Sequence, residues 1–481
     1  MAKFNLKIFC FVLFYVLCVS FYLNYYVIGE QNMRKWDKAE LGSLLDKDGN
    51  VPHPKKPVTI KYWTVPIMPK GEEEFVKNKI NEFKKLYPEV TIEYEVLTWE
   101  GQNEKYQAAL LEGNLPDVMM QGICEGGPDK GGLPLNGWIS QKDLDDFLPG
   151  LIEEFRYPGD NKFYGIPLLC THNSCMYINV DMFEKAGIDW KPLQEKPWNR
   201  KEFVEICKKL TIDKNKDGKI DQYGFGFGAL AKNYEGMPML TNIMWTLGGD
   251  IETQNFQSLK ADTSQFREAL QFLYDLMYTY KVTPETVLGQ NVWDIQPWWY
   301  RGTFAIYQGG GTYVINETRE YNKSLSPGEK DKQISFTVVL PIYEGHRMVK
   351  LGPGGVSCKN QDDEEKVFAS VAFAKFLTST EGCKRAADVY MLPARKSSGN
   401  SFQNDKDMTL AIKIAMEYGI ETSSFHSVLT KNAFYEVFEK AFAPNIEAVL
   451  GKQKTLDKAV ADIDKKINVI LNNYKRRMQY K

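Results

Sequence analysis

The sequence predicts an α/β fold built on a mostly parallel β-sheet that is flanked by helices. Residues 58–62 alternate apolar and polar side chains, as a half-buried strand does, and residues 90–96 repeat this alternation. Between them, residues 71–87 carry one apolar stripe at three- and four-residue steps, which is typical of a helix. A second helix expected over 103–111 leads to a short apolar strand at 115–120. Because helices separate these strands, right-handed crossovers should join parallel strands.

Length and composition limit the class of protein. A chain of 481 residues is too long for one hydrophobic core, so we expect two lobes or more. The formal net charge is −2 with both signs well mixed, which argues against nucleic-acid binding because that function needs a basic face. The 8 cysteines show neither a Cys-x-x-Cys pair nor zinc-ligand spacing, so we expect buried free thiols. The alternative is a disulfide between Cys170 and Cys175.

The N-terminus predicts export. Two lysines precede an apolar run at residues 8–28, which as a helix would span about 30 Å and could cross a bilayer. We expect residues 1–29 to be an uncleaved membrane anchor, because no good small-x-small cleavage site follows the run. The alternatives are a cleaved signal peptide or lipidation at Cys18. Residues 30–56 are polar and weakly periodic, which predicts a tether to a body that lies extracytoplasmically, outside the cytoplasmic membrane.

A series of short motifs gives the chain a family resemblance. These motifs are Leu115-Pro116-Asp117-Val118, Tyr164-Gly165-Ile166-Pro167, Trp245-Thr246-Leu247-Gly248-Gly249-Asp250, Phe304-Ala305-Ile306 and Leu392-Pro393-Ala394-Arg395. In order and spacing the chain resembles the family 1 extracellular solute-binding proteins of bacterial ABC importers, the maltose-binding-protein-like, sugar-binding group. The resemblance implies a two-lobe periplasmic-binding-protein-like fold (type II), with a ligand cleft between the lobes.

The same resemblance implies the domain boundaries. Lobe one should comprise residues 57–170 and 347–392, and lobe two residues 175–341 and 396–481. The chain should cross between the lobes near residues 171–174, 341–347 and 392–396. Three crossings together can act as a hinge about which the lobes close over a ligand.

A sugar site needs aromatic platforms for the apolar ring faces and polar groups for the hydroxyls. The aromatic candidates are Trp63, Trp99, Trp245, Trp298, Trp299 and Tyr313. The polar candidates are Gln121, His172, Asn173, Asp250 and Arg395. The backbone candidates are Gly310 and Gly311 in the triple glycine, and Gly354, whose loop the family often brings to the ligand. The alternative role for each tryptophan is core packing, and for His172 it is a structural hydrogen bond.

One further stretch, residues 213–221, has the spacing of a calcium loop. The candidate ligands are Asp213, Asn215, Asp217, Lys219 and Asp221, with Gly218 at the sixth position. The twelfth position is Gly224, which lacks the bidentate carboxylate of an EF-hand. A structural calcium ion is therefore one interpretation, and a polar turn held by Asx hydrogen bonds is the other.

The sequence favours a binding protein over an enzyme, because it contains no Gly-x-Ser-x-Gly, His-Glu-x-x-His or phosphate-loop motif. We expect a monomer, with no cofactor beyond the calcium ion, that captures a carbohydrate, most simply an oligosaccharide, and delivers it to the permease subunits of an ABC transporter. The alternatives are a membrane-tethered ligand sensor without transport and a secreted glycan hydrolase.

Overall fold

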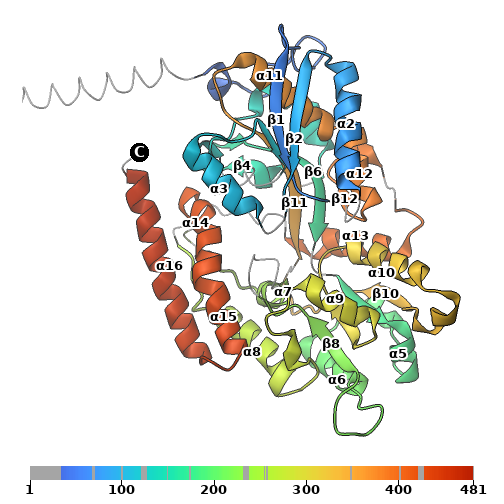
Figure 1. Ribbon diagram of the computed structural model, residues 1–481. Coiled ribbons are helices and arrows are strands. Elements are labelled where there is room, and N and C mark those ends of the chain that lie inside the picture. Colours follow the sequence, from blue (N-terminus) through green and yellow to red (C-terminus); the bar gives the residue numbers. More distant parts are fainter. Residues whose placement is uncertain are drawn as a thin grey trace, which may run out of the picture.

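The computed structural model shows two lobes, one above the other in Figure 1, each with its own sheet and hydrophobic core. It describes residues 34–67, 71–98, 101–120, 127–148, 150–172, 175–230, 238–253, 255, 258–346, 349–399, 402–420 and 427–479. The predicted two-lobe α/β fold is confirmed. Both sheets are mixed, however, and not mostly parallel.

Lobe one is built on a seven-stranded sheet in the order β12-β6-β11-β3-β1-β2, with β13 paired to β11. The strands are β1 (Val58–Thr64), β2 (Val90–Val96), β3 (Val118–Met120), β6 (Ile166–His172), β11 (Val349–Cys358), β12 (Leu392–Pro393) and β13 (Gly419–Ile420). β1 is parallel to β2 and to β3, as the sequence predicts. β11 is antiparallel to both β3 and β6, so β6 runs in the same direction as β1, β2 and β3.

Helices flank this sheet. They are α2 (Glu72–Leu86), α3 (Gln102–Glu112), α4 (Gln141–Asp146), α11 (Glu364–Leu377) and α12 (Thr380–Asp388). In α2 the side chains of Val76 and Phe83 are buried, and Phe83 packs edge-on against Phe373 of α11, with 5.0 Å between ring centroids. Such aromatic contacts stabilise the layer between helix and sheet.

Lobe two has a four-stranded sheet in the order β10-β7-β9-β8. Its strands are β7 (Met176–Asn179), β8 (Tyr223–Phe227), β9 (Phe304–Gln308) and β10 (Phe336–Val339), and its helices include α5 (Val180–Lys185), α6 (Arg200–Leu210), α7 (Pro238–Thr246), α8 (Ser264–Tyr278), α9 (Val292–Tyr300) and α10 (Tyr313–Ser324). β8 and β9 are parallel, whereas β7 is antiparallel to both β9 and β10. β8, β9 and β10 therefore end at the edge where β7 begins.

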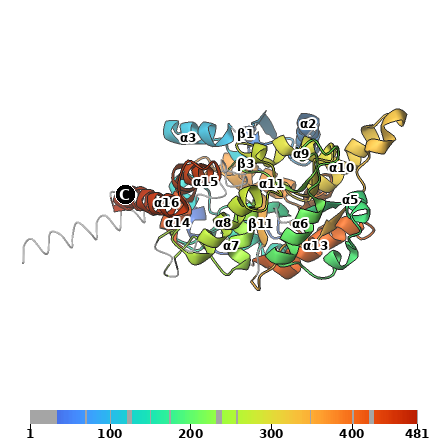
Figure 2. The ribbon, with the colours of Figure 1, turned by 90° about the horizontal axis from the view of Figure 1, so that it is seen from below.

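The C-terminal part of the chain is helical: α13 (Lys406–Tyr418), α14 (Val428–Val437), a π-helical segment (Phe438–Phe442), α15 (Ala443–Leu450) and α16 (Leu456–Gln479). Both views place α14 and α16 along one flank of the molecule (Figures 1 and 2). Val460, Ile463 and Ile467 of α16 are buried in the core of lobe two, because they recur at three- and four-residue steps on one face.

The N-terminal segment expected to be a tether belongs, from Arg34 onward, to lobe one. Trp36 is 4% exposed in the lobe-one core, and its indole Nε1 donates a hydrogen bond to Asn360 Oδ1 at 2.8 Å. The Leu44 N–H donates to the carbonyl of Gly137 at 2.8 Å, and Val51 is also buried. We call residues 34–51 the N-terminal strap. The tether prediction is wrong for these residues, because an aromatic anchor and main-chain bonds fix them to the domain.

The strand ends define where the chain passes between the lobes. β6 of lobe one ends at His172 and β7 of lobe two begins at Met176, so the chain passes between the two sheets within this short stretch. The third crossing lies later than residues 392–396. β12 pairs with β6, and Ala394 N donates to Leu168 O at 3.2 Å, which keeps this stretch in lobe one. The chain enters the lobe-two core only at Phe402.

The cysteines behave as the composition predicts. The 5 that lie in the described part of the chain form no disulfide bond with one another and are all buried, and these include Cys170 and Cys175. The alternative disulfide between these two residues is therefore wrong. Among the described residues, no helix is long and apolar enough to cross a membrane.

Candidate ligand site between the lobes

The two sheets turn their carboxyl edges toward each other. In lobe one, β1, β2, β3 and β6 end at a common edge, because all four run in the same direction. In lobe two, β8, β9 and β10 end at the edge where β7 begins. The short link from β6 to β7 joins these two edges. Ligands of open α/β sheets bind beyond the carboxyl ends of the strands, so the candidate site lies between the lobes.

The triple glycine, residues 309–311, follows β9 at this edge, and tyrosines pack tightly around it. A Cβ on Gly309 would lie 1.8 Å from the Tyr307 hydroxyl, and one on Gly310 would lie 1.8 Å from the Tyr313 hydroxyl. The Tyr177 hydroxyl donates to the carbonyl of Gly311 at 2.9 Å. Gly310 also has φ +61°, which disfavours any residue with a side chain. The glycines therefore make room for tyrosines, and the ring of Tyr313 folds back over Gly310.

Burial keeps these tyrosines neutral. It raises the pKa of Tyr177 and of Tyr307 well above their ordinary value. The Tyr307 hydroxyl donates to the carbonyl of Val292 at 2.9 Å, so it fixes the first turn of α9 to the end of β9. The triple glycine thus sits in a rigid cluster of hydrogen-bonded phenols.

The direction of α9 decides which of its three tryptophans, Trp293, Trp298 and Trp299, lies near the carboxyl edge of the sheet. The helix runs antiparallel to β9, so only its first turn reaches the carboxyl edge. Trp298 lies at the opposite end, with its ring centroid 6.0 Å from that of Phe304, the first residue of β9. Trp299 is completely buried, stacks on Tyr307 at 5.7 Å and donates from Nε1 to Thr318 Oγ1 at 3.3 Å. These two residues were predicted as platforms, but Trp299 has no free face and Trp298 is about 13 Å from the edge along the strand.

The residue that sequence reasoning missed is Trp293. It is 45% exposed in the first turn of α9, directly after Val292. A Cβ on Gly228, the residue after β8, would lie 2.8 Å from the Val292 main-chain nitrogen, which places this turn beside the ends of both β8 and β9. The signal was present in the sequence: Asn291 caps the helix, and its side chain accepts from the N–H groups of Trp293 and Asp294.

The other described aromatic candidates differ in accessibility. Trp63 packs in the small cluster beneath α3, and Lys105 Nζ lies 4.7 Å from its ring centroid, so a lysine already covers one face. Trp245 is half-buried against the core of lobe two. The next residue, Thr246, accepts at Oγ1 from the N–H of Glu344 at 2.6 Å, which places Trp245 near the second crossing.

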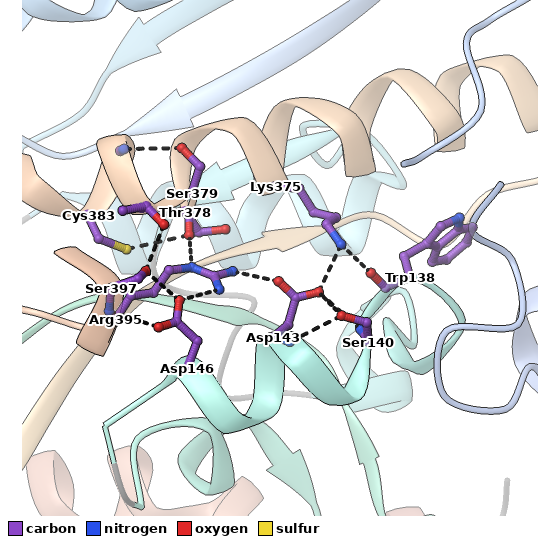
Figure 3. Close-up of polar contacts among 12 residues, drawn as sticks. Trp138, Ser140, Asp143, Asp146, Lys375, Thr378, Ser379, Cys383, Arg395 and Ser397 are labelled. Atoms are coloured by element: carbon purple, nitrogen blue, oxygen red, sulfur yellow. Dashed lines mark hydrogen bonds and ion pairs between the residues drawn. The ribbon is translucent and has the colours of Figure 1, made fainter. Parts of the chain in front are cut away.

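Arg395 is engaged inside lobe one (Figure 3). The Arg395 side chain is 8% exposed, and its guanidinium donates to the carbonyl of Thr378 at 2.6 Å, to Asp146 Oδ2 at 3.1 Å and to Asp143 Oδ1 at 3.0 Å. It also lies 4.4 Å from the centroid of the Phe147 ring. All these partners lie in lobe one, so Arg395 ties the β12 segment to α4. It has a structural role and does not serve as the hydroxyl partner predicted from the sequence.

The carboxylates of this network are held ionised. Burial alone would raise the pKa of Asp143, but Lys375, the Ser140 main-chain N–H and Arg395 lower it to about 2. Lys375 Nζ lies 3.1 Å from Asp143 Oδ2 and 2.7 Å from the carbonyl of Trp138 (Figure 3). Such a paired cluster stabilises the fold and offers no free group to a ligand.

The remaining predicted residues give little information on the site. Trp99, Gln121 and Asn173 lie outside the described residues. His172 pairs through its main chain with Leu351 of β11. Gly354 is a buried β11 residue opposite Leu169, next to a register shift in the strand. Asp250 is exposed, and its Oδ1 caps a turn by accepting from the N–H of Ile251 at 2.6 Å.

The loop at residues 213–221 is organised by Asx hydrogen bonds. Asp213 accepts from the N–H groups of Lys216 at 2.7 Å and Gly218 at 2.8 Å, and Asp221 accepts from that of Lys214 at 2.7 Å. Within the described part of the chain, no three or more His, Cys, Asp and Glu side chains converge as metal ligands would. The hydrogen bonds favour the polar-turn interpretation.

Comparison with known protein families identifies the class. The family model described as bacterial extracellular solute-binding protein matches residues 69–382. This range covers most of both lobes, and the chain belongs to that family. Its members are binding proteins and not enzymes, so the hydrolase alternative is wrong, and the family name implies an extracytoplasmic location.

Individual relatives are more distant. A relative from Brucella abortus (strain 2308) is 29% identical over 182 residues, which is 35% of this chain and 38% of that protein. The arabinooligosaccharide-binding protein of Halalkalibacterium halodurans is 26% identical over 268 residues, or 50% of this chain and 49% of that protein. The chain thus spans about half or less of the length of these curated relatives.

Solved structures share the fold along nearly their whole length. Maltose-bound MalE3 from T. maritima has a TM-score of 0.67 at 23% identity, covering 86% of this chain and 99% of that one. The MalE domain of Bdellovibrio bacteriovorus bound to maltotriose has a TM-score of 0.66 at 20% identity, covering 87% and 100%. A Listeria monocytogenes substrate-binding protein in complex with cycloalternan has a TM-score of 0.68 at 19% identity, covering 86% and 99%.

Proposed function

We propose that this protein captures an oligosaccharide between its lobes and delivers it to the permease of an ABC importer. The observation that carries the proposal is the pair of opposed carboxyl edges in a member of the solute-binding family. One relative is named as an arabinooligosaccharide-binding protein, and the three solved structures hold maltose, maltotriose or cycloalternan, which supports a sugar as the solute. We further propose that residues 1–29 anchor the protein to the outer face of the membrane.

Trp293 is the aromatic platform that the structure supports best. Among the described residues beside the ends of β8 and β9, Trp293 is an exposed large aromatic residue, at 45%. Trp245 near the second crossing is a second candidate, and Trp99 of lobe one stays a prediction from the sequence. Aromatic rings at separate places along the site suit a ligand of several sugar units.

The experiment is a thermal-shift screen of mono- and oligosaccharides, amino acids and peptides, followed by calorimetry on the compounds that bind. Trp293→Ala should weaken the binding of a sugar found in the screen by about tenfold, because stacking contributes on the order of 1.4 kcal/mol. The matched control is Trp298→Ala, a tryptophan five positions further along the same helix but at the far end of the strand. Its affinity should stay within about twofold of the wild type.

Two results would contradict the proposal in different ways. Binding of a peptide while all saccharides are silent would refute the carbohydrate assignment and leave the solute-binding fold intact. A sugar whose affinity drops in Trp298→Ala but not in Trp293→Ala would refute the placement of the platform.

A further inference from the structure

The lobes also touch on one flank, away from the three crossings. In lobe one, a 3-10 helix (Ile152–Phe155) leads into the hairpin of β4 (Arg156–Tyr157) and β5 (Lys162–Phe163). Lys431 of α14 donates from Nζ to the main-chain carbonyl of Glu154 at 3.3 Å and to that of Arg156 at 3.2 Å. We call this the flank contact.

The two sides of the flank contact belong to different lobes. Leu429, Ala433 and Phe434 of α14 are buried in the core of lobe two, so the helix that carries Lys431 moves with that lobe. Its acceptors are main-chain atoms of lobe one. The lobes also approach closely in the same place, because a Cβ on Gly159 of the hairpin would lie 2.9 Å from Val428 Cγ2. The flank contact therefore combines a charged hydrogen bond with apolar packing.

The chemistry favours a specific, reversible contact. The Glu154 carbonyl lies in the last turn of a 3-10 helix, where outward carbonyls carry partial negative charge and attract a cation. Lys431 is partly buried there, so water competes less for its ammonium group than at an open surface.

The position of the flank contact makes it sensitive to lobe rotation. Figures 1 and 2 place α14 on the flank and β11 in the middle of the molecule, and Figure 1 shows β6 beside β11 there. When two lobes rotate about a hinge, atoms far from the axis move furthest. The lobes cannot separate on this side unless Lys431 releases the two carbonyls.

We propose that Lys431 is an interlobe latch that holds the ligand-free protein in the arrangement of Figure 1. The latch restrains the movement of the two lobes independently of the solute. It makes opening, and with it ligand exchange, depend on one lysine in the C-terminal helices.

Hydrogen exchange of the full-length, ligand-free protein tests the latch, read by mass spectrometry. Lys431→Met keeps the aliphatic stem and removes the charge. Exchange should become at least about threefold faster in residues 156–163, and also at the strand ends that face the opposite lobe, residues 62–67 and 308–315. The matched control is Lys440→Met, because Lys440 bonds only within lobe two, to Glu436 at 2.9 Å, and its side chain is 65% exposed. The control should exchange like the wild type.

A second variant keeps the test decisive if Lys431→Met lowers the melting temperature. Gly159→Ala would place a Cβ 2.7 Å from the Tyr157 ring and 2.9 Å from Val428, so it acts on the flank contact from lobe one without changing α14. It should speed exchange at the same strand ends. Faster exchange confined to the hairpin, or none in either variant, would show that the flank contact does not restrain the lobes and would overturn the proposal.

Discussion

Replacing Arg395 by methionine should destabilise the protein by about 3 kcal/mol. The guanidinium makes three hydrogen bonds, to Thr378, Asp143 and Asp146, and the side chain is 8% exposed. Taking roughly 1.5 kcal/mol for each hydrogen bond to a charged group, the loss of all three costs about 5 kcal/mol. A methionine that packs on Phe147 recovers on the order of 2 kcal/mol of apolar burial.

The two carboxylates that lose Arg395 keep other partners, which limits the loss of unfolding free energy in Arg395→Met. Asp143 keeps Lys375 at 3.1 Å, and Asp146 keeps the hydroxyl of Ser397 at 2.7 Å and its N–H at 2.8 Å. Neither acid becomes an isolated buried charge, which would cost more.

The assay is urea unfolding followed by tryptophan fluorescence and by circular dichroism, because agreement between the two probes shows whether the lobes unfold together. The matched control is Arg267→Met. Arg267 also joins two aspartates, Asp262 at 2.8 Å and Asp457 at 2.6 Å, but its side chain is 30% exposed and those of its partners 52% and 90%. The control should lose less than about 1 kcal/mol. An equal loss in both variants would refute the argument from burial.

The pH dependence gives a second check on the same network. The pKa of Asp143 is lowered to about 2 in the folded protein. A carboxyl whose folded pKa is depressed stabilises the fold above its unfolded pKa of about 4, and this stability is lost as the pH falls from about 4 toward 2. Arg395 is one cause of the depression, so the difference between wild type and Arg395→Met should shrink over that window. A difference that does not change with pH would show that Asp143 is not part of the effect.

Three further outcomes are expected. Gly310→Ala should lower the melting temperature much more than Gly289→Ala: both glycines have positive φ, but only at Gly310 would the Cβ meet a tyrosine hydroxyl, at 1.8 Å, and similar shifts would contradict the tyrosine cluster. Trp36→Ala should cost roughly 3 kcal/mol in urea unfolding, because it empties a buried site, whereas an unchanged midpoint would restore the flexible tether. Chelation of divalent cations should leave the melting temperature unchanged if residues 213–221 form a polar turn, and a downward shift that disappears in Asp217→Ala would establish the calcium site instead.

The sequence predicts the strands and helices of lobe one well because their apolar periods are regular. Val58 to Thr64 of β1 pairs in register with Val90 to Val96 of β2, close to the ranges that the alternation indicates. The antiparallel course of β7 and β11 was not visible, since it depends on which strands carry the chain between lobes. A period of two gives a strand its faces but not its direction.

The site was harder to predict because an aromatic residue gives no sign of the face it occupies. Trp293 and Trp299 lie on one short helix, yet one is 45% exposed and the other is completely buried. Their separation follows from the direction of α9 against β9, which is a tertiary property. Arg395 shows the same limit, because the aspartates that bind it come from α4, some 250 positions earlier in the chain.

The N-terminal strap bears on how the protein would search for its transporter. Since residues 34–51 are fixed to lobe one, an anchor at residues 1–29 would lie four residues from the strap, and four residues span at most about 14 Å. Lobe one would then be held close to the lipid surface and could not diffuse away from it. The encounter with a permease in the same membrane would become a two-dimensional search at high effective concentration, in which low intrinsic affinity between the two partners is sufficient.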